Sequence, residues 1–64
     1  MKWTDVGEIA IALSEAHSGQ DPKTVNFVDL RDRILALPAF SDDPARCGEK
    51  ILEAIQQAWI EEVA

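Results

Sequence analysis

Two Asp-Pro pairs, Asp21-Pro22 and Asp43-Pro44, divide this 64-residue chain into three segments. An Asp that can cap a helix, followed by a Pro in the first helical turn, is a typical helix start. In each segment the apolar residues recur three or four positions apart, as on one face of a helix. The pattern predicts an all-α fold of mainly three helices in one domain, residues 1–64.

The first helix is expected to start at Thr4 or Asp5 and to end at Ser18-Gly19. Asp5 and Glu8 have the spacing of a capping box, in which the two side chains bond the backbone of the first turn. In the second segment we expect a short turn after Pro22, then an extended step over residues 25–28. The segment's helix is then expected to be capped by Asp29 and stopped by Pro38.

The third helix is predicted to run from about Pro44 to Val63 and to be the longest. Its core stripe is predicted as Ile51, Ile55, Ala58 and Trp59, with Leu52 and Ala54 at the margins. The first helix should bury Val6, Ile9, Leu13 and Ala16, and the second Leu30, Ile34 and Leu37. Both tryptophans are expected in the core because a domain this small has few apolar side chains to spare.

Charge narrows the classes of partner. The chain carries 12 acidic and 6 basic residues, a formal net charge of -6. Nucleic acid and anionic membranes need a basic face, so basic protein surfaces and cations are the expected partners. The lone Cys47 fits a reducing compartment, and no signal peptide or membrane span is recognisable, which together favour a cytoplasmic protein.

The acidic residues around the start of the third helix are candidate metal ligands. Glu49 and Glu53 are four residues apart and project from one side of a helix, while Asp42 and Asp43 precede it. Open carboxylate sites bind divalent cations weakly and with little selectivity. Asp5 and Glu8 are a second candidate pair.

An alternative interpretation keeps these acids as caps and a solvated face. Arg46 would then pair with Glu49, and Lys50 with Glu53. Likewise Arg33, four residues after Asp29, would pair with it.

Four stretches resemble one family in order and spacing. They are Lys2-Trp3-Thr4-Asp5, Asp21-Pro22-Lys23-Thr24-Val25 with Phe27, Asp29 and Leu30, Phe40-x-Asp42-Asp43-Pro44, and Glu49-Lys50-Ile51-Leu52-Glu53-Ala54-Ile55 followed by Trp59. On these residues the chain resembles the IscX (YfhJ) family from Lys2 to about Glu62. The chain differs from the family pattern at Ile11, where an acid is usual, at Arg33, where an aromatic residue is usual, and at Cys47-Gly48. The roles of Arg33 and Cys47 are left open.

The resemblance implies a modified winged-helix or helix-turn-helix-like domain with at most a rudimentary wing. It further implies a non-enzymatic protein of bacterial iron–sulfur cluster assembly that binds Fe²⁺ weakly and binds the cysteine desulfurase IscS. The scaffold IscU or ferredoxin would be affected indirectly, and we expect a monomer. The rival hypothesis is a small helix-turn-helix DNA-binding regulator that carries Arg31 and Arg33 outward on its second helix. Two or three cations against 12 carboxylates leave little driving force for DNA binding.

Overall fold

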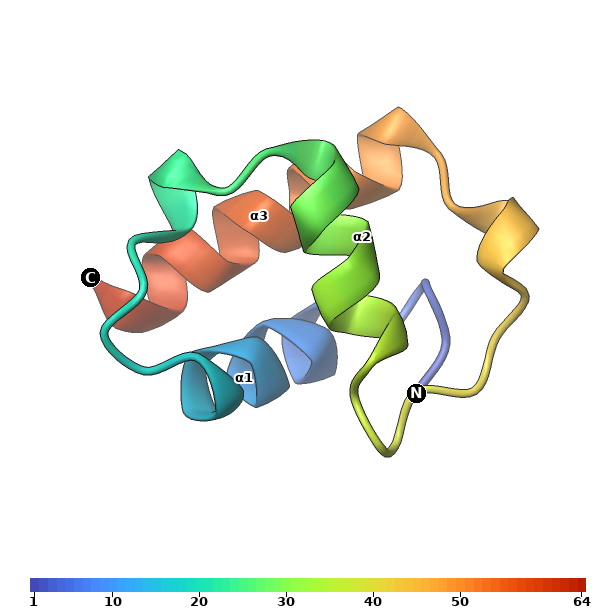
Figure 1. Ribbon diagram of the computed structural model, residues 1–64, viewed down its shortest axis with the longest axis horizontal. Coiled ribbons are helices and arrows are strands. Elements are labelled where there is room, and N and C mark those ends of the chain that lie inside the picture. Colours follow the sequence, from blue (N-terminus) through green and yellow to red (C-terminus); the bar gives the residue numbers. More distant parts are fainter.

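The computed structural model describes residues 1–64 as three helices without any β-strand: α1 Val6–Ala16, α2 Phe27–Leu35 and α3 Glu49–Val63. Two short 3₁₀ turns, η1 Pro22–Thr24 and η2 Pro44–Arg46, lie in the connections. α1 packs along α3, and α2 runs across the pair (Figure 1). The predicted all-α class is confirmed. None of the helices has the length and apolar character needed to cross a membrane.

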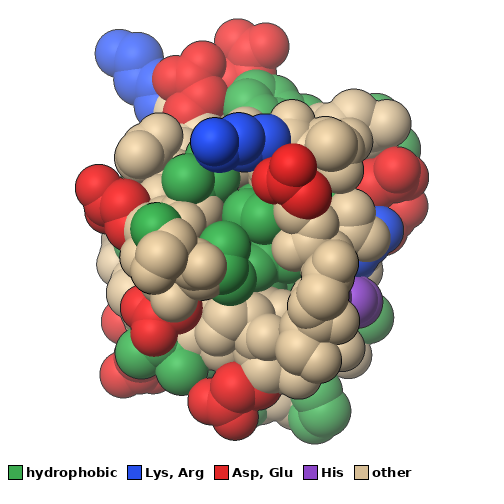
Figure 2. Space-filling view, turned by 90° about the vertical axis from the view of Figure 1, so that its left-hand side faces the viewer, with side chains coloured by type: hydrophobic (Ala, Val, Ile, Leu, Met, Phe, Trp, Pro, Cys, Tyr) green, Lys and Arg blue, Asp and Glu red, His purple; other side chains and the backbone are tan.

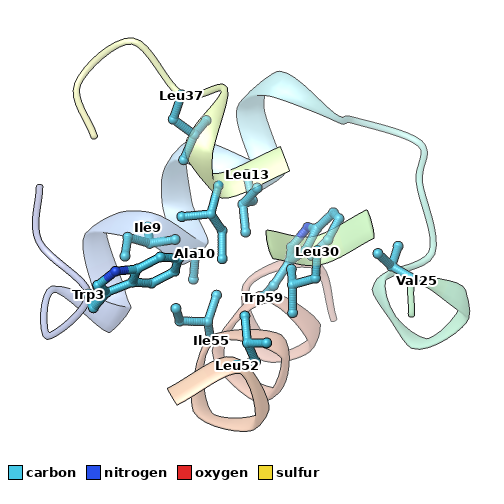
Figure 3. Packing of buried hydrophobic residues seen from close by; sticks show 11 residues of the cluster. Trp3, Ile9, Ala10, Leu13, Val25, Leu30, Leu37, Leu52, Ile55 and Trp59 are labelled. Atoms are coloured by element: carbon cyan, nitrogen blue, oxygen red, sulfur yellow. The ribbon is translucent and has the colours of Figure 1, made fainter. Parts of the chain in front are cut away.

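The core draws on all three helices and on both ends of the chain. Eleven hydrophobic residues are buried in one cluster: Trp3, Ile9, Ala10, Leu13, Val25, Leu30, Ile34, Leu37, Leu52, Ile55 and Trp59. Figure 3 shows the two indoles entering this cluster from opposite sides. Both tryptophans are therefore core residues, as their number and the size of the chain predicted.

α3 presents a slightly different face to the core from the one predicted. Leu52, Ile55 and Trp59 are its buried residues, whereas Ile51 and Ala58 are half-buried at the edge of the stripe. The spacing of three and then four residues keeps Leu52, Ile55 and Trp59 on one line along the helix. In α1, Ala10 is buried, while Ala16, which was predicted to be in the core, is exposed.

The start of α2 was predicted wrongly. Residues 27 and 28 are helical rather than extended, and Asn26 rather than Asp29 is the N-cap. The Asn26 side-chain oxygen accepts a hydrogen bond from the Asp29 N–H at 2.9 Å, which satisfies one of the free donors of the first turn. This earlier start brings Phe27 into contact with the core.

The start of α3 was also predicted wrongly. Asp43-Pro44 opens only the turn η2, and Cys47 and Gly48 are extended before the helix begins at Glu49. A continuous helix would place Gly48 in its interior, which costs about 1 kcal/mol relative to Ala. The helix is interrupted before Glu49 instead, and Gly48 becomes the N-cap of α3.

Candidate functional site

The six predicted carboxylates divide into two groups according to what their oxygens bond. Asp5, Asp42 and Asp43 accept hydrogen bonds from the backbone. Glu8, Glu49 and Glu53 are exposed on helices and take part in no side-chain hydrogen bond or ion pair. No three or more His, Cys, Asp or Glu side chains gather closely enough to hold a metal ion.

Asp42 fastens the N-terminal segment to the loop between α2 and α3. Its Oδ2 accepts a hydrogen bond from the Trp3 N–H at 3.0 Å, and its Oδ1 accepts one from the Asp43 N–H at 2.7 Å. These two backbone donors, with smaller contributions from Lys2 and Arg46, hold the pKa of the Asp42 carboxyl below its usual value. The fold thus favours the charged form of Asp42, which accepts both hydrogen bonds.

Asp43 completes the same attachment. Its Oδ1 accepts a hydrogen bond from the Ala45 N–H at 2.9 Å and caps η2, while its backbone carbonyl accepts the Trp3 indole N–H at 2.8 Å. Trp3 also packs edge-on against Phe40, with ring centroids 4.6 Å apart. We call residues 1–3 together with residues 40–43 the N-terminal clasp.

Asp5 and Glu8 do not form the predicted capping box. Asp5 is the N-cap of α1 by position, but its side chain makes no capping hydrogen bond. Its Oδ2 instead accepts the Lys2 N–H at 2.8 Å, so the carboxylate supports the turn before the helix. The backbone ψ of Asp5, 57°, differs from the extended value usual for a cap, which explains the change of partner. Glu8 is left free in the first turn of α1.

Glu49 and Glu53 lie one turn apart on α3 and are exposed. The pairings expected in the alternative interpretation, with Arg46 and Lys50, are absent. The ion pair present in the structure joins the half-buried Arg31 to its exposed neighbour Asp32 at 4.0 Å. The carboxylates of α3 therefore keep their full charge available to solvent or to a partner.

Arg31 and Arg33, the basic residues of α2, contact other residues of the same chain. Arg33 was expected to pair with Asp29 but does not. Its Nη1 lies 3.4 Å from His17 Nδ1 and 3.4 Å from the Gln20 side-chain oxygen. Arg31 donates to the Pro44 carbonyl at 3.4 Å. Both arginines are half-buried, so they do not form the outward row that a DNA-reading helix would present.

Cys47 is close to Arg31 and packs against the core. Burial raises the pKa of the Cys47 thiol, and the Arg31 guanidinium opposes this rise only in part. The thiol is accordingly held in its protonated, less reactive form.

A residue missed from the sequence is Gln56. The polar residues Glu53 and Gln57 beside it on α3 are exposed, yet Gln56 is half-buried. Its amide donates to the Pro22 carbonyl at 2.9 Å and to the Val25 carbonyl at 3.0 Å, which fixes η1 against α3. A single polar residue beside a core stripe gives no signal of this kind in the sequence.

A family model described as "Iron-sulphur cluster assembly" matches residues 1–64. The chain belongs to the IscX/YfhJ family. It is also 66% identical over 62 residues to a Pseudomonas aeruginosa protein described as uncharacterized, a match that covers 97% of this chain and 94% of that protein. The resemblance found in the sequence motifs is confirmed, and Trp3, Asp42 and Asp43 of those motifs form the clasp of this IscX-family protein.

Proposed function

We propose that this IscX-family protein is an acidic adaptor of iron–sulfur cluster assembly. It binds the cysteine desulfurase IscS and, weakly, Fe²⁺ through surface carboxylates. Family membership supports the pathway. The observation that carries the adaptor role is the near absence of internal neutralisation: among 12 acidic residues, only Asp32 lies within ion-pair distance of a basic side chain.

The mechanism is electrostatic. A surface with a net charge of -6 attracts a basic groove over a distance of about one Debye length, roughly 10 Å at 0.1 M salt. Such attraction speeds encounter and makes binding depend strongly on salt. An adaptor docked in the groove gates the delivery of sulfur or iron to the scaffold IscU, and ferredoxin is affected only through that step.

Iron binding uses the same charges. Glu49 and Glu53 repel each other by a few tenths of a kcal/mol at their spacing, and a shared cation removes this repulsion. Two carboxylates without further ligands form an open oxygen site, which binds divalent cations weakly. Bound Fe²⁺ lowers the negative charge and so competes with docking. Glu49, Glu53 and Glu8 rank first for both roles, since Asp42, Asp43 and Asp5 already serve the backbone.

The docking test is calorimetry with purified IscS at low salt. The double variant Glu49→Lys with Glu53→Lys should weaken binding at least tenfold, which corresponds to about 1.4 kcal/mol. The matched control is Glu61→Lys with Glu62→Lys, an equal change of charge at the other end of α3. Unchanged affinity of the first variant removes Glu49 and Glu53 from docking, and equal losses in both variants show that net charge alone is recognised.

The iron test is an Fe²⁺ titration followed by ¹⁵N NMR. Amide signals around Glu49 and Glu53 should broaden progressively during the titration, because a weakly bound Fe²⁺ ion exchanges quickly between the site and the solution. The variant Glu49→Gln with Glu53→Gln should lose this response. A wild-type spectrum that does not respond to Fe²⁺ rules out iron binding and leaves an adaptor without metal.

A further inference from the structure

All three helices expose an aliphatic side chain, but α1 is the one helix that carries no basic residue, whereas α2 and α3 contain Arg or Lys. Ile11, near the middle of α1, is 45% exposed. Glu8 and Glu15 lie on either side of it along the chain, are exposed, and make no ion pair.

The space around this face is open. A Cβ placed on Gly7, one turn before Ile11, would meet no atom within 4 Å. Figure 1 shows α1 near the lower edge of the molecule. On the side drawn in Figure 2, acidic and hydrophobic side chains adjoin near the bottom, and no basic side chain is seen there.

The folded chain gives no reason for this composition. Gly7 lies in the first turn of α1, and a side chain at this position would meet no neighbouring atom, so packing does not require a glycine there. Ile11 remains largely outside the core to which its neighbours Ile9, Ala10 and Leu13 belong. A helix face with an accessible backbone and an exposed aliphatic group between two free carboxylates has the features of a contact surface.

We propose that the α1 face formed by Gly7, Glu8, Ile11 and Glu15 docks a basic protein surface that offers an apolar side chain between its cations. Charge complementarity selects this occupant, because two unpaired carboxylates and no cation surround the aliphatic group. The inference rests on the proposed function and adds a short-range apolar contact to the long-range attraction. A second copy of the chain is disfavoured as occupant, since each copy carries the same net charge of -6.

The two kinds of contact respond differently to salt. Attraction between exposed charges is screened as the salt concentration rises, whereas burial of Ile11 is not. A contact centred on Ile11 therefore keeps a salt-independent contribution to affinity. This contribution separates α1 from the carboxylates of α3, which act through charge alone.

The test compares matched variants for binding to purified IscS by calorimetry at low and high salt. Ile11→Ser should weaken binding about fivefold at both salt concentrations. The control is Val28→Ser, which alters a residue that is 70% exposed on α2 and should leave affinity unchanged. Glu8→Gln with Glu15→Gln should weaken binding at low salt only, and circular dichroism confirms that each variant is folded.

The outcomes are distinguishable. Equal affinities of Ile11→Ser and wild type, or equal losses for Ile11→Ser and Val28→Ser, overturn the α1 proposal and leave the adaptor function intact. No binding by the wild type overturns both. Sedimentation of the chain alone gives a further check: self-association that Ile11→Ser abolishes would assign the face to a second copy and overturn the proposal.

Discussion

The carboxylates of the N-terminal clasp and those of the helices are the same chemical group in two different roles. The Asp42 carboxylate accepts the Trp3 N–H from 39 positions away in the chain, and the Asp43 carboxylate accepts the Ala45 N–H within its own turn. Glu49 and Glu53 bond nothing within the protein. The acidic residues therefore fall into two groups, one bonded to the backbone and one free. Under the proposed function, a substitution should affect stability in the clasp and partner binding on the helix.

The most damaging change to the clasp should be Trp3→Ala. It removes a fully packed indole, its hydrogen bond to Asp43 and its contact with Phe40. Loss of a buried Trp costs about 3–5 kcal/mol, a large part of the stability of a domain this small. Urea unfolding followed by circular dichroism measures the loss.

Trp3→Phe keeps an aromatic ring in place and removes the indole N–H. This variant keeps the prediction testable if Trp3→Ala does not fold. Its loss should be smaller, about 1 kcal/mol for the hydrogen bond plus a small cost of packing. Wild-type stability in both variants would show that the clasp contributes nothing to the fold.

The second prediction concerns pH and Asp42. Its pKa is lowered in the folded state, so above the ordinary value of 3.8 the charged form stabilises the protein fully. As the pH falls below 3.8, the unfolded chain takes up the proton first and this stabilisation is lost, until Asp42 is protonated in the folded state as well. Wild type should therefore lose stability over this acid range more steeply than Asp42→Asn.

The measurement is the urea midpoint between pH 2 and pH 7, with Glu53→Gln as the control from the helix group. At neutral pH, Asp42→Asn should be clearly less stable than wild type and Glu53→Gln should not. If the urea midpoints of wild type and Asp42→Asn fell equally steeply with decreasing pH, the role given to the two backbone donors would be contradicted.

The sequence predicts the helices better than it predicts their ends or the clasp. Apolar spacing identifies α1, α2 and α3, because Ile9 with Leu13, Leu30 with Ile34, and Ile55 with Trp59 must each share a face. The clasp has no such periodicity: Trp3 and Asp42 are 39 positions apart in the chain, and nothing local specifies their contact. Three of the six predicted site residues, Asp5, Asp42 and Asp43, serve the backbone, and the sequence indicated capping for such acids but not the partners that the structure shows.

The N-cap of α2 is a second feature that the sequence alone does not specify. Both Asn26 and Asp29 have side chains suited to an N-cap, and the sequence gives no rule that selects between them. Asn26 is selected in the structure, and the helix that starts at Phe27 buries part of that ring against the core. Long-range packing therefore decides a local boundary.

The third prediction uses this cap. Asn26→Ala removes the acceptor for the Asp29 N–H and should cost about 1 kcal/mol. Asp29→Asn keeps the backbone donor and removes a charge from the first turn of α2, which should cost only about 0.3–1 kcal/mol through the helix dipole. Urea unfolding of both variants decides, and an equal or larger loss for Asp29→Asn would restore Asp29 as the more important residue.

The smallest effect on stability is expected from Glu49→Gln with Glu53→Gln. The change relieves a repulsion of a few tenths of a kcal/mol and gives up a similar attraction between Glu49 and the helix dipole. The two contributions have opposite signs, so urea unfolding should place this variant within about 0.5 kcal/mol of wild type. The same variant should bind IscS measurably more weakly at low salt, because it removes two of the free charges that attract the partner. Loss of binding without loss of stability is the reverse of the result expected for Asp42→Asn, and a destabilised Glu49 and Glu53 variant would show that the helix carboxylates also serve the fold.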